Sequence, residues 1–360
     1  MEGLSVNELK IFSDSATYDL FFSSNWDEIR TDIDRCAAVI IDDKVFGLYG
    51  EILNIQDKKI IKIKVSEDIK TPQTALDICE EMVLAGVTRD AFIVAIGGGV
   101  VQDLVTFAAS IYMRGIDWVL YPTTLLSQAD SCIGGKSSIN FKSWKNILGN
   151  FYTPKRIYIQ SQFLETLTDD DIRSGIGEIL KVFMLSGQES LERLIEQMNC
   201  YQNDSRVLES LIFESLKLKN NILEVDALDN GLRLKMNYGH SFGHALEAAT
   251  HFGIPHGIAV TIGLDVANYF ALKQGLIEHH LFDRLHSTLT LNLIDSDFVD
   301  FNFNEFIRAL EKDKKNKQGF YGLIVPVSQG EVELKFFEMN QINNSMIREY
   351  FTKYYSANVE

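Results

Sequence analysis

The feature of this sequence that most constrains its fold is an apolar run that ends directly in three glycines. Residues 91–96 predict a buried β-strand, Gly97, Gly98 and Gly99 follow it, and a helical pattern containing Asp103 comes next. Glycine allows a tight turn and a close approach of the backbone to a ligand. The helix start then offers free N–H groups to a phosphate. Because the pattern is not G-x-G-x-x-G, it fits a structural turn as well as a dinucleotide site.

The first half of the chain alternates strand and helix patterns. A helix is predicted over 71–86 from apolar residues at helical spacing, and this alternation implies a parallel sheet with helices on its faces. The predicted strands are 36–42, 59–65, 91–96, 118–121 and 156–159.

After about residue 161 the pattern becomes helical. Thr168 and the three aspartates that follow it predict a capped helix start, and most segments up to about residue 310 have helical periodicity. Only 321–327 and 331–336 are rich in β-formers. We therefore predict an α/β protein with a Rossmann-like parallel-sheet nucleotide domain at 1–165 and a mostly helical domain at 166–360.

Composition narrows the class of protein. A chain of 360 residues with 46% hydrophobic residues suits two globular domains, and a net charge of -16 disfavours non-specific nucleic-acid binding. No apolar run is long enough to predict a membrane span, and the N-terminus does not resemble a signal peptide. None of the four cysteines forms a C-x-x-C pair. We expect a cytoplasmic enzyme with free thiols and no membrane or nucleic-acid partner.

The sharpest local signal is the segment 238–247, YGHSFGHALE. His240 and His244 are four residues apart, so on a helix they share one face, where they can bind zinc or simply pack. His256 opens the next helix, and Glu178 stands on an otherwise apolar helix, where a lone buried carboxylate would be costly. Two histidines and one carboxylate are a common catalytic zinc arrangement.

Basic residues recur beside glycines and polar loop residues. Each alone fits a solvated surface charge, but several in one place would hold a substrate with phosphate and carboxylate groups. The set comprises Arg114, Lys136, Lys145, Lys181, Lys219, Arg233 and the run Asp313-Lys314-Lys315.

Together these motifs resemble the 3-dehydroquinate synthase family of sugar-phosphate cyclases, over nearly the whole chain. The matching blocks are GGGVVQD (97–103), YMRG (112–115), PTTLLSQADSCIGGKSSIN (122–140), KNILGNFYTPK (145–155), SGIGEILK (174–181), GLRLKMNYGHSFGHALE (231–247), HG (256–257) and DKK (313–315).

The resemblance implies a role for each matched residue. Glu178, His240 and His256 would be ligands of zinc or cobalt. The NAD site would comprise Asp43, Glu67, Lys70, Gly97, Gly98, Gly99, Val100, Asp103, Thr123, Thr124, Lys136, Lys145, Phe163 and Thr166. Catalytic groups would be Asp130, Lys136, Lys181, Lys219, Arg233, Asn237 and His244, with Arg114, Asn146 and Lys315 binding substrate. Arg114 resembles an arginine that family members offer to the neighbour's substrate phosphate, which implies a homodimer.

Family chemistry implies conversion of 3-deoxy-D-arabino-heptulosonate 7-phosphate to 3-dehydroquinate and phosphate, a step of the shikimate pathway to aromatic amino acids. NAD would oxidise the C5 hydroxyl while the metal polarises the C4 and C5 oxygens. Phosphate would be eliminated, the ketone reduced again, and the opened ring closed by an aldol step. Because NAD is regenerated, the net reaction would be that of a lyase.

The sequence departs from the family pattern in four places. Gln102 replaces a glycine beside the glycine turn, where it can alter the approach of a cofactor, and Ile258 replaces the glutamate of H-G-E, which removes an acid near the metal. Val182-Phe183 and Ser137-Ser138 also differ. None of these changes removes a predicted catalytic group, but together they keep a divergent cyclase open.

Alternative activities therefore remain. Arg233 and Asn237 match residues that face a substrate carboxylate, which favours a heptulosonate over the substrates of 2-deoxy-scyllo-inosose and valiolone-type synthases. An aminodehydroquinate synthase would use nearly the same set. A metal-dependent polyol dehydrogenase needs no phosphate clamp, and a metal-binding scaffold without activity would not need the polar set.

Overall fold

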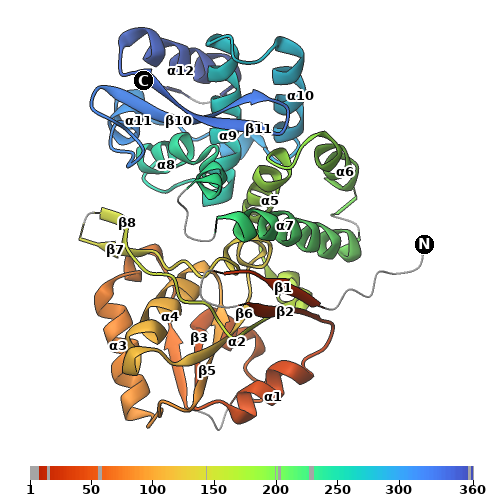
Figure 1. Ribbon diagram of the computed structural model, residues 1–360, viewed down its shortest axis with the longest axis vertical. Coiled ribbons are helices and arrows are strands. Elements are labelled where there is room, and N and C mark those ends of the chain that lie inside the picture. Colours follow the sequence, from red (N-terminus) through yellow and green to blue (C-terminus); the bar gives the residue numbers. More distant parts are fainter. Residues whose placement is uncertain are drawn as a thin grey trace. The chain divides into compact units, whose positions relative to one another are not determined.

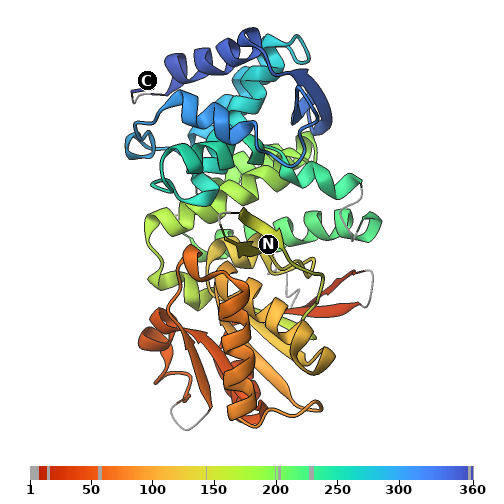
Figure 2. The same ribbon diagram turned by 90° about the vertical axis from the view of Figure 1, so that its left-hand side faces the viewer.

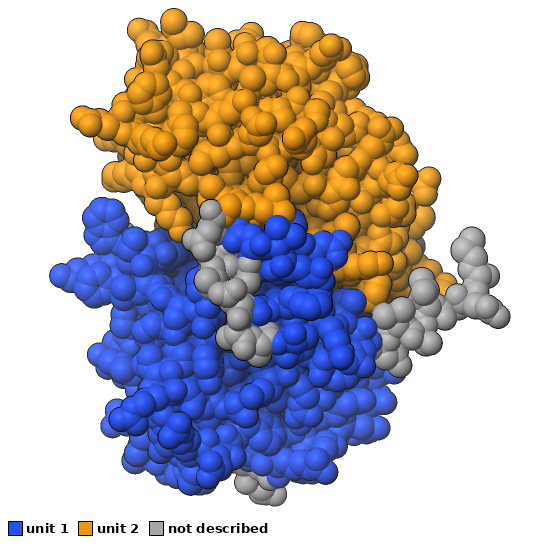
Figure 3. Space-filling view, viewed as in Figure 1, with its two compact units in different colours: residues 1–167, 220–228 blue, residues 168–219, 229–360 orange. Residues whose placement is uncertain are grey.

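The structure, a computed structural model, describes residues 8–13, 17–55, 59–142, 144–198, 200–201, 204–226, 231–355 and 358–359. The chain forms two compact units (Figure 3): unit 1 is Met1–Leu167 with Asn220–Leu228, and unit 2 is Thr168–Lys219 with Asp229–Glu360. The predicted combination of an α/β nucleotide-type fold and a mostly helical part is confirmed.

Unit 1 is built on a seven-stranded sheet of order β1-β2-β9-β6-β5-β3-β4. All neighbours pair in parallel except β1 and β2, which pair antiparallel. The strands are β1 (Glu8–Ile11), β2 (Tyr18–Ser23), β3 (Ala38–Asp42), β4 (Ile60–Ile63), β5 (Phe92–Gly97), β6 (Asp117–Pro122) and β9 (Arg156–Gln160). The five strands expected from the sequence are confirmed, whereas β1 and β2 were not predicted.

Helices cover the sheet of unit 1 because successive strand residues point to opposite faces, and both faces are apolar. On one face, Ile29 and Ile33 of α1 (Asp27–Arg35) join the core that also contains Val94 and Ile96 of β5. Figures 1 and 2 show α3 and α4 together on one side of the strands. The remaining helices are α2 (Asp43–Tyr49), α3 (Pro72–Leu84) and α4 (Gly99–Ile111).

Unit 2 is organised around α9 (His256–Lys273), which is buried without interruption from Gly257 to Ala271. A helix that is apolar on every side is a core helix, and α9 packs against α5, α8, α10, α12 and β10 (Figure 1). The other elements are α5 (Asp169–Met184), α6 (Gln188–Met198), α7 (Ser205–Val225), α8 (His240–Ala249), α10 (His279–Thr290), α11 (Phe303–Leu310), α12 (Gln341–Tyr354) and the antiparallel pair β10 (Phe320–Ser328) and β11 (Glu331–Glu338).

The change of unit within α7 has no signal in the sequence. Residues up to Lys219 belong to unit 2 and those from Asn220 to unit 1, yet no glycine or proline interrupts α7. The Asn220 side chain donates to the carbonyl of Lys10 at 3.0 Å and accepts from the N–H of Phe12 at 3.1 Å. These two bonds satisfy the backbone of the edge strand β1 and of the residue after it.

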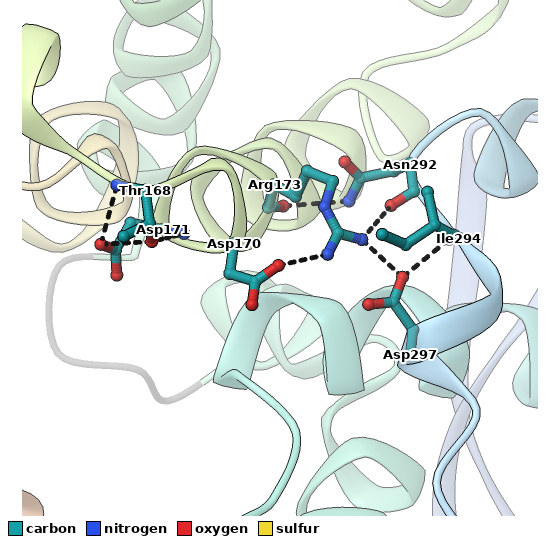
Figure 4. A network of polar contacts seen from close by, with 7 residues as sticks. All are labelled: Thr168, Asp170, Asp171, Arg173, Asn292, Ile294 and Asp297. Carbon is teal, nitrogen blue, oxygen red and sulfur yellow. Dashed lines mark hydrogen bonds and ion pairs between the residues drawn. The ribbon is translucent and has the colours of Figure 1, made fainter.

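The first turn of α5 is fixed by a polar network (Figure 4). Thr168 and Asp171 form the predicted capping box. Buried Arg173 pairs with Asp170 and with Asp297, and Asn292 donates to the Arg173 carbonyl at 3.0 Å. These contacts tie the start of α5 to the chain that follows α10, and so set the position of the residues one turn further along α5.

All four cysteines are free, as expected. Among the helices in the described parts of the chain, none has both the length and the apolar character needed to cross a bilayer.

A second buried polar group joins three helices of unit 2. Asp265 of α9 is 1% exposed and accepts from His286 Nδ1 of α10 at 2.6 Å and from the Tyr350 hydroxyl of α12 at 2.8 Å. The hydrogen bond that His286 donates to Asp265 raises the pKa of His286. A histidine with a raised folded-state pKa stabilises the fold below its unfolded pKa of about 6.5 and loses that contribution as the pH rises through the folded value.

We therefore expect His286→Gln to lower the free energy of unfolding by about 1–2 kcal/mol at pH 6, and by less at pH 9. Denaturant titrations at both pH values measure the difference. The control is His280→Gln on the same helix, whose side chain is 81% exposed and should contribute little. Equal pH dependence in the wild type and in His286→Gln would contradict the role of this pair.

Candidate functional site

The glycine turn of unit 1 combines tight packing with open space. Strand β5 ends at Gly97, and α4 begins at Gly99. A Cβ on Gly97 would overlap the Val101 side chain, and one on Gly98 would lie 2.8 Å from Cγ2 of Thr124. Nothing lies within 4 Å of the place where a Cβ of Gly99 would be. The first two glycines are therefore required by packing, and the third leaves room for a phosphate at the start of α4.

The predicted cofactor residues of unit 1 gather at the carboxyl ends of the parallel strands, where ligands bind in such sheets. Thr123 and Thr124 follow β6, and the Thr123 N–H donates to the Gly97 carbonyl at 3.1 Å. Asp43 is exposed at the start of α2, after β3. Val100 lies in the first turn of α4.

Two of the predicted residues follow β9. Phe163 is packed between Trp26 and Tyr49, with ring centroids 5.1 Å away in both cases, so its side chain belongs to the core. Thr166 lies 3.0 Å from the Tyr49 hydroxyl through its Oγ1. A buried ring leaves only backbone atoms of Phe163 to contact a ligand.

A charged cluster lies beside the glycine turn. The buried ammonium of Lys70 is 3.2 Å from a carboxylate oxygen of Glu67 and 3.2 Å from one of Asp103. Burial raises the pKa of Asp103 to about 6, against the opposing effects of Lys70 and of the Ser138 N–H. The sequence analysis placed these three charged residues in one site, and the structure brings them together.

The remaining predicted residues of unit 1 lie between α4 and β9. Asp130 is buried in a π-helical turn, Ser127–Ser131, and Lys136 is half-buried. Lys145 and Asn146 are exposed in the short strand β8 (Trp144–Leu148), which pairs with β7 (Ile139–Phe141). Arg114 is exposed and has a left-handed backbone, with φ 69.

Gln102 does not extend into the glycine turn. Its buried side-chain amide donates to the Ser131 carbonyl at 2.6 Å and accepts from the Ser131 hydroxyl at 2.9 Å. The departure from glycine therefore ties α4 to the π-helical turn that carries Asp130.

Unit 2 brings together the predicted metal ligands. Glu178 of α5 is 2% exposed, and its Oε1 lies 3.6 Å from Nε2 of His240 and 3.2 Å from Nε2 of His256. Ligand atoms of His240, His244 and His256 all lie within 4.8 Å of one another. A buried carboxylate that faces two imidazole nitrogens, with a third imidazole close to both rings, is a donor set that fits a zinc or cobalt ion.

Backbone contacts at glycines allow this convergence. A Cβ on Gly177 of α5 would overlap the carbonyl oxygen of Gly257 in α9, and one on Gly257 would overlap that of Ser174. A Cβ on Gly263 of α9 would overlap the carbonyl oxygen of Gly239, which precedes α8 and has a left-handed φ of +78. Each predicted ligand is adjacent in the sequence to one of these glycines. Glu178 follows Gly177, His240 follows Gly239 and His256 precedes Gly257.

Further charged groups surround the ligand cluster. Lys181 pairs with Glu178 in the interior, and Glu247 Oε1 lies 3.3 Å from His256 Nδ1. Burial opposes a charge on His256, but Glu178 and Glu247 raise its pKa to about 10. Burial, followed by the charge of Lys181, holds the pKa of His240 well below its usual value.

The other predicted residues of unit 2 lie on several different segments. Lys315 donates to Asp313 at 2.8 Å, and Asp313 also bonds Ser241 of α8. Arg233 and Asn237 lie in the 3-10 segment Leu232–Asn237, with Arg233 buried. Lys219 is buried on α7.

Sequence reasoning assigned no role to two residues that the structure brings to these sites. Glu247 contacts His256, and Asn140 bonds Glu67 at 3.0 Å. An acid one turn after His244 on the same helix was the available signal for Glu247, whereas Asn140 had none. Ile258, which replaces an acid of the family pattern, is fully buried in α9.

The glycines at which these helices touch allow a direct test of the helix crossing. Gly177→Ala should lower the free energy of unfolding by roughly 2–4 kcal/mol, because the new methyl group meets a backbone carbonyl that cannot move freely. Zinc affinity, measured by competition with a chromophoric chelator, should fall at least about tenfold. Gly47→Ala is the control, since nothing lies within 4 Å of its Cβ position in α2. A fully stable, zinc-binding Gly177→Ala protein would contradict the close crossing of α5 and α9.

Comparison with known proteins agrees with this arrangement. Residues 60–174 match the model of the 3-dehydroquinate synthase N-terminal domain, and residues 175–316 match that of the C-terminal domain. The chain is 38% identical over 298 residues to a 3-dehydroquinate synthase from Dictyoglomus thermophilum, covering 82% of this chain and 84% of the relative. It is 34% identical to one from Alkaliphilus oremlandii, over 91% of this chain and 93% of that protein.

Solved structures show the same fold at lower identity. A 2-deoxy-scyllo-inosose synthase complexed with carbaglucose-6-phosphate, NAD+ and Co2+ has a TM-score of 0.84 at 22% identity, covering 95% of this chain and 99% of its own. A 2-epi-5-epi-valiolone synthase from Streptomyces hygroscopicus with NAD+ and Zn2+ bound has a TM-score of 0.80 at 24% identity, covering 94% and 97%. Both domain models of the family match this chain, and relatives that are 34% and 38% identical to it cover most of its length. This chain therefore belongs to the 3-dehydroquinate synthase family.

Proposed function

We propose that this protein is a 3-dehydroquinate synthase, a lyase-type cyclase that converts 3-deoxy-D-arabino-heptulosonate 7-phosphate to 3-dehydroquinate and phosphate. The observation that carries the proposal is the convergence of Glu178, His240 and His256 beside Lys181, in a chain whose curated relatives bear that name. A donor set for a divalent cation next to a buried ammonium suits a substrate with several negative charges.

Glu178, His240 and His256 would hold zinc or cobalt, and the start of α4 with Lys70 and Asp103 would hold NAD. When bound, the metal supplies Lewis-acid polarisation of substrate oxygens, and NAD supplies reversible hydride acceptance. His256 is oriented for this task by Glu247, whose carboxylate is 3.3 Å from Nδ1 and leaves Nε2 directed at Glu178.

Other residues of unit 2 would bind the substrate. Lys181 pairs with Glu178 in the buried interior and presents an ammonium beside it. His244 is the exposed ring of the three, so we assign it to substrate and to proton exchange with it. Arg233 would bind the substrate carboxylate through its planar guanidinium, which distinguishes a heptulosonate from a sugar that lacks this group.

The activity is tested by phosphate release from 3-deoxy-D-arabino-heptulosonate 7-phosphate with NAD and zinc. We expect turnover without net NADH and its loss on chelation. Glu178→Gln should lower kcat/KM by a factor of about a thousand or more, because a charged metal ligand is lost. Glu189→Gln, at an exposed position of α6, is the matched control. A zinc-loaded, NAD-binding protein that releases no phosphate would refute the assignment, and net NADH would indicate a dehydrogenase.

We also propose a homodimer in which Arg114 serves the neighbouring subunit. Arg114 is exposed between Met113 and Gly115, and all three residues have positive φ values, of 69, 49 and 119 respectively. Backbone strain of this kind is maintained where a side chain must be presented in one direction. Exposed apolar side chains next to it in the sequence, Ile111 and Met113, provide surface for an interface.

A mixed dimer tests this arrangement. Arg114→Ala and Glu178→Gln homodimers should each be nearly inactive. Co-expressed in equal amounts they should recover about a quarter of wild-type activity, because half of the dimers are mixed and each mixed dimer has one complete site. Light scattering measures the mass of each species. Absence of recovery in confirmed mixed dimers would show that Arg114 acts within its own subunit.

A further inference from the structure

The hairpin of β7 and β8 contains a bulge at the residues proposed to bind ligands. The two strands pair at their ends, and between the paired ends the stretch 145–147 stands opposite Asn140 alone. Asn146, in the middle of that stretch, has a left-handed backbone with φ 52. A bulge redirects the side chains of its strand, and here those side chains are Lys145 and Asn146.

Burial does not hold this bulge in place. Every residue of β8 is exposed, so apolar packing contributes little to its conformation. A left-handed backbone at a residue other than glycine costs roughly 1 kcal/mol, although asparagine tolerates it better than most. The bulge therefore depends on hydrogen bonds, and above all on the partner of the Asn146 N–H.

That partner is the side chain of Asn140. Its Oδ1 accepts from the Asn146 N–H at 2.9 Å, and its Nδ2 donates to the backbone carbonyl of Glu67 at 3.1 Å and to the Glu67 carboxylate at 3.0 Å. The Asn140 N–H also donates to the Lys70 carbonyl at 2.7 Å. The amide is buried, and it is engaged through both its acceptor and its donor.

Through Glu67 the same amide reaches the charged cluster beside the glycine turn. Glu67 and Asp103 both contact the ammonium of Lys70, each at 3.2 Å. Asp103 in turn accepts from the Ser138 N–H at 2.9 Å, two residues before Asn140. The bonds thus form a circuit that begins at Asn140 in β7 and ends at Ser138, the residue before that strand.

We propose that Asn140 is a positioning residue that fixes the bulge of β8 and couples it to the Glu67–Lys70–Asp103 cluster. Occupation of the cluster by the nucleotide then sets the direction of Lys145 and Asn146. The Asn140 amide can accept from Asn146 and donate to Glu67 at the same time, whereas an ionised carboxylate in its place could only accept. The ligand roles of Lys145 and Asn146 rest on the proposed function, whereas the circuit of hydrogen bonds does not.

Hydrogen exchange of the full-length protein, read by mass spectrometry over residues 144–148, tests the circuit without any assay of activity. Asn140→Leu removes both halves of the amide and should speed exchange at Asn146 about tenfold. Asn140→Asp keeps the acceptor but replaces the donor with a carboxylate that faces Glu67. Its exchange without NAD should stay near that of the wild type. We expect NAD to slow exchange at Asn146 in the wild type but not in Asn140→Asp.

A matched control lies at the base of the same hairpin. Asn150 is also held through its amide, which donates to the Ser110 hydroxyl and accepts from the Ser137 hydroxyl at 2.7 Å. Asn150→Leu should leave exchange at Asn146 within about threefold of wild type. Wild-type exchange in Asn140→Leu, or intact NAD protection in Asn140→Asp, would overturn the proposal. If Asn140→Leu does not fold, the Asn140→Asp comparison alone decides.

Kinetics then separate positioning from a general loss of structure. Asn140→Leu and Asn146→Ala should each raise KM for the heptulosonate phosphate about tenfold with little change in kcat, and the double variant should be no worse than the poorer single variant. Additive effects would overturn the proposal, because Asn140 would not act through Asn146. Altered exchange in a protein that never turns over this substrate would leave the circuit standing and refute the proposed function.

Discussion

The structure of unit 2 depends on backbone-to-backbone contact between α9 and its two neighbours. Gly177 and Gly257 allow α5 to cross α9, and Gly239 and Gly263 do the same for the start of α8. No side chain separates the helices at these points, so the residues next to the glycines are forced together. The donor cluster is therefore a product of helix packing, and its geometry is as firm as that of the core around α9.

This arrangement explains why a buried acid is tolerated there. Glu178 would be costly in an apolar interior by itself, but it lies against the ammonium of Lys181 and two imidazoles. Glu247 adds a second carboxylate at His256. Charge is thus balanced locally, and the polar cluster can sit inside a unit whose central helix is buried along most of its length.

Much of the fold could be predicted from the sequence, because hydrophobic periodicity and the residues that begin or end an element are local signals. The strand that ends in Gly97, the helix start at Thr168 and the shared helix face of His240 and His244 all follow from nearby residues. The antiparallel edge strand β1 and the bonds of Asn140 depend on residues far apart in the chain, for which a single sequence carries no signal. The ligand roles that the resemblance implies still await experiment.

The course of the chain through α7 limits how this protein can be dissected. Unit 1 is completed only by Asn220–Leu228, and unit 2 is made of two separate stretches. A gene fragment that ends at Leu167 would lack Asn220, whose amide satisfies the backbone at Lys10 and Phe12. No single cut therefore yields two intact halves. A fragment of unit 1 made for study by itself would have to carry the last turns of α7 on a grafted linker.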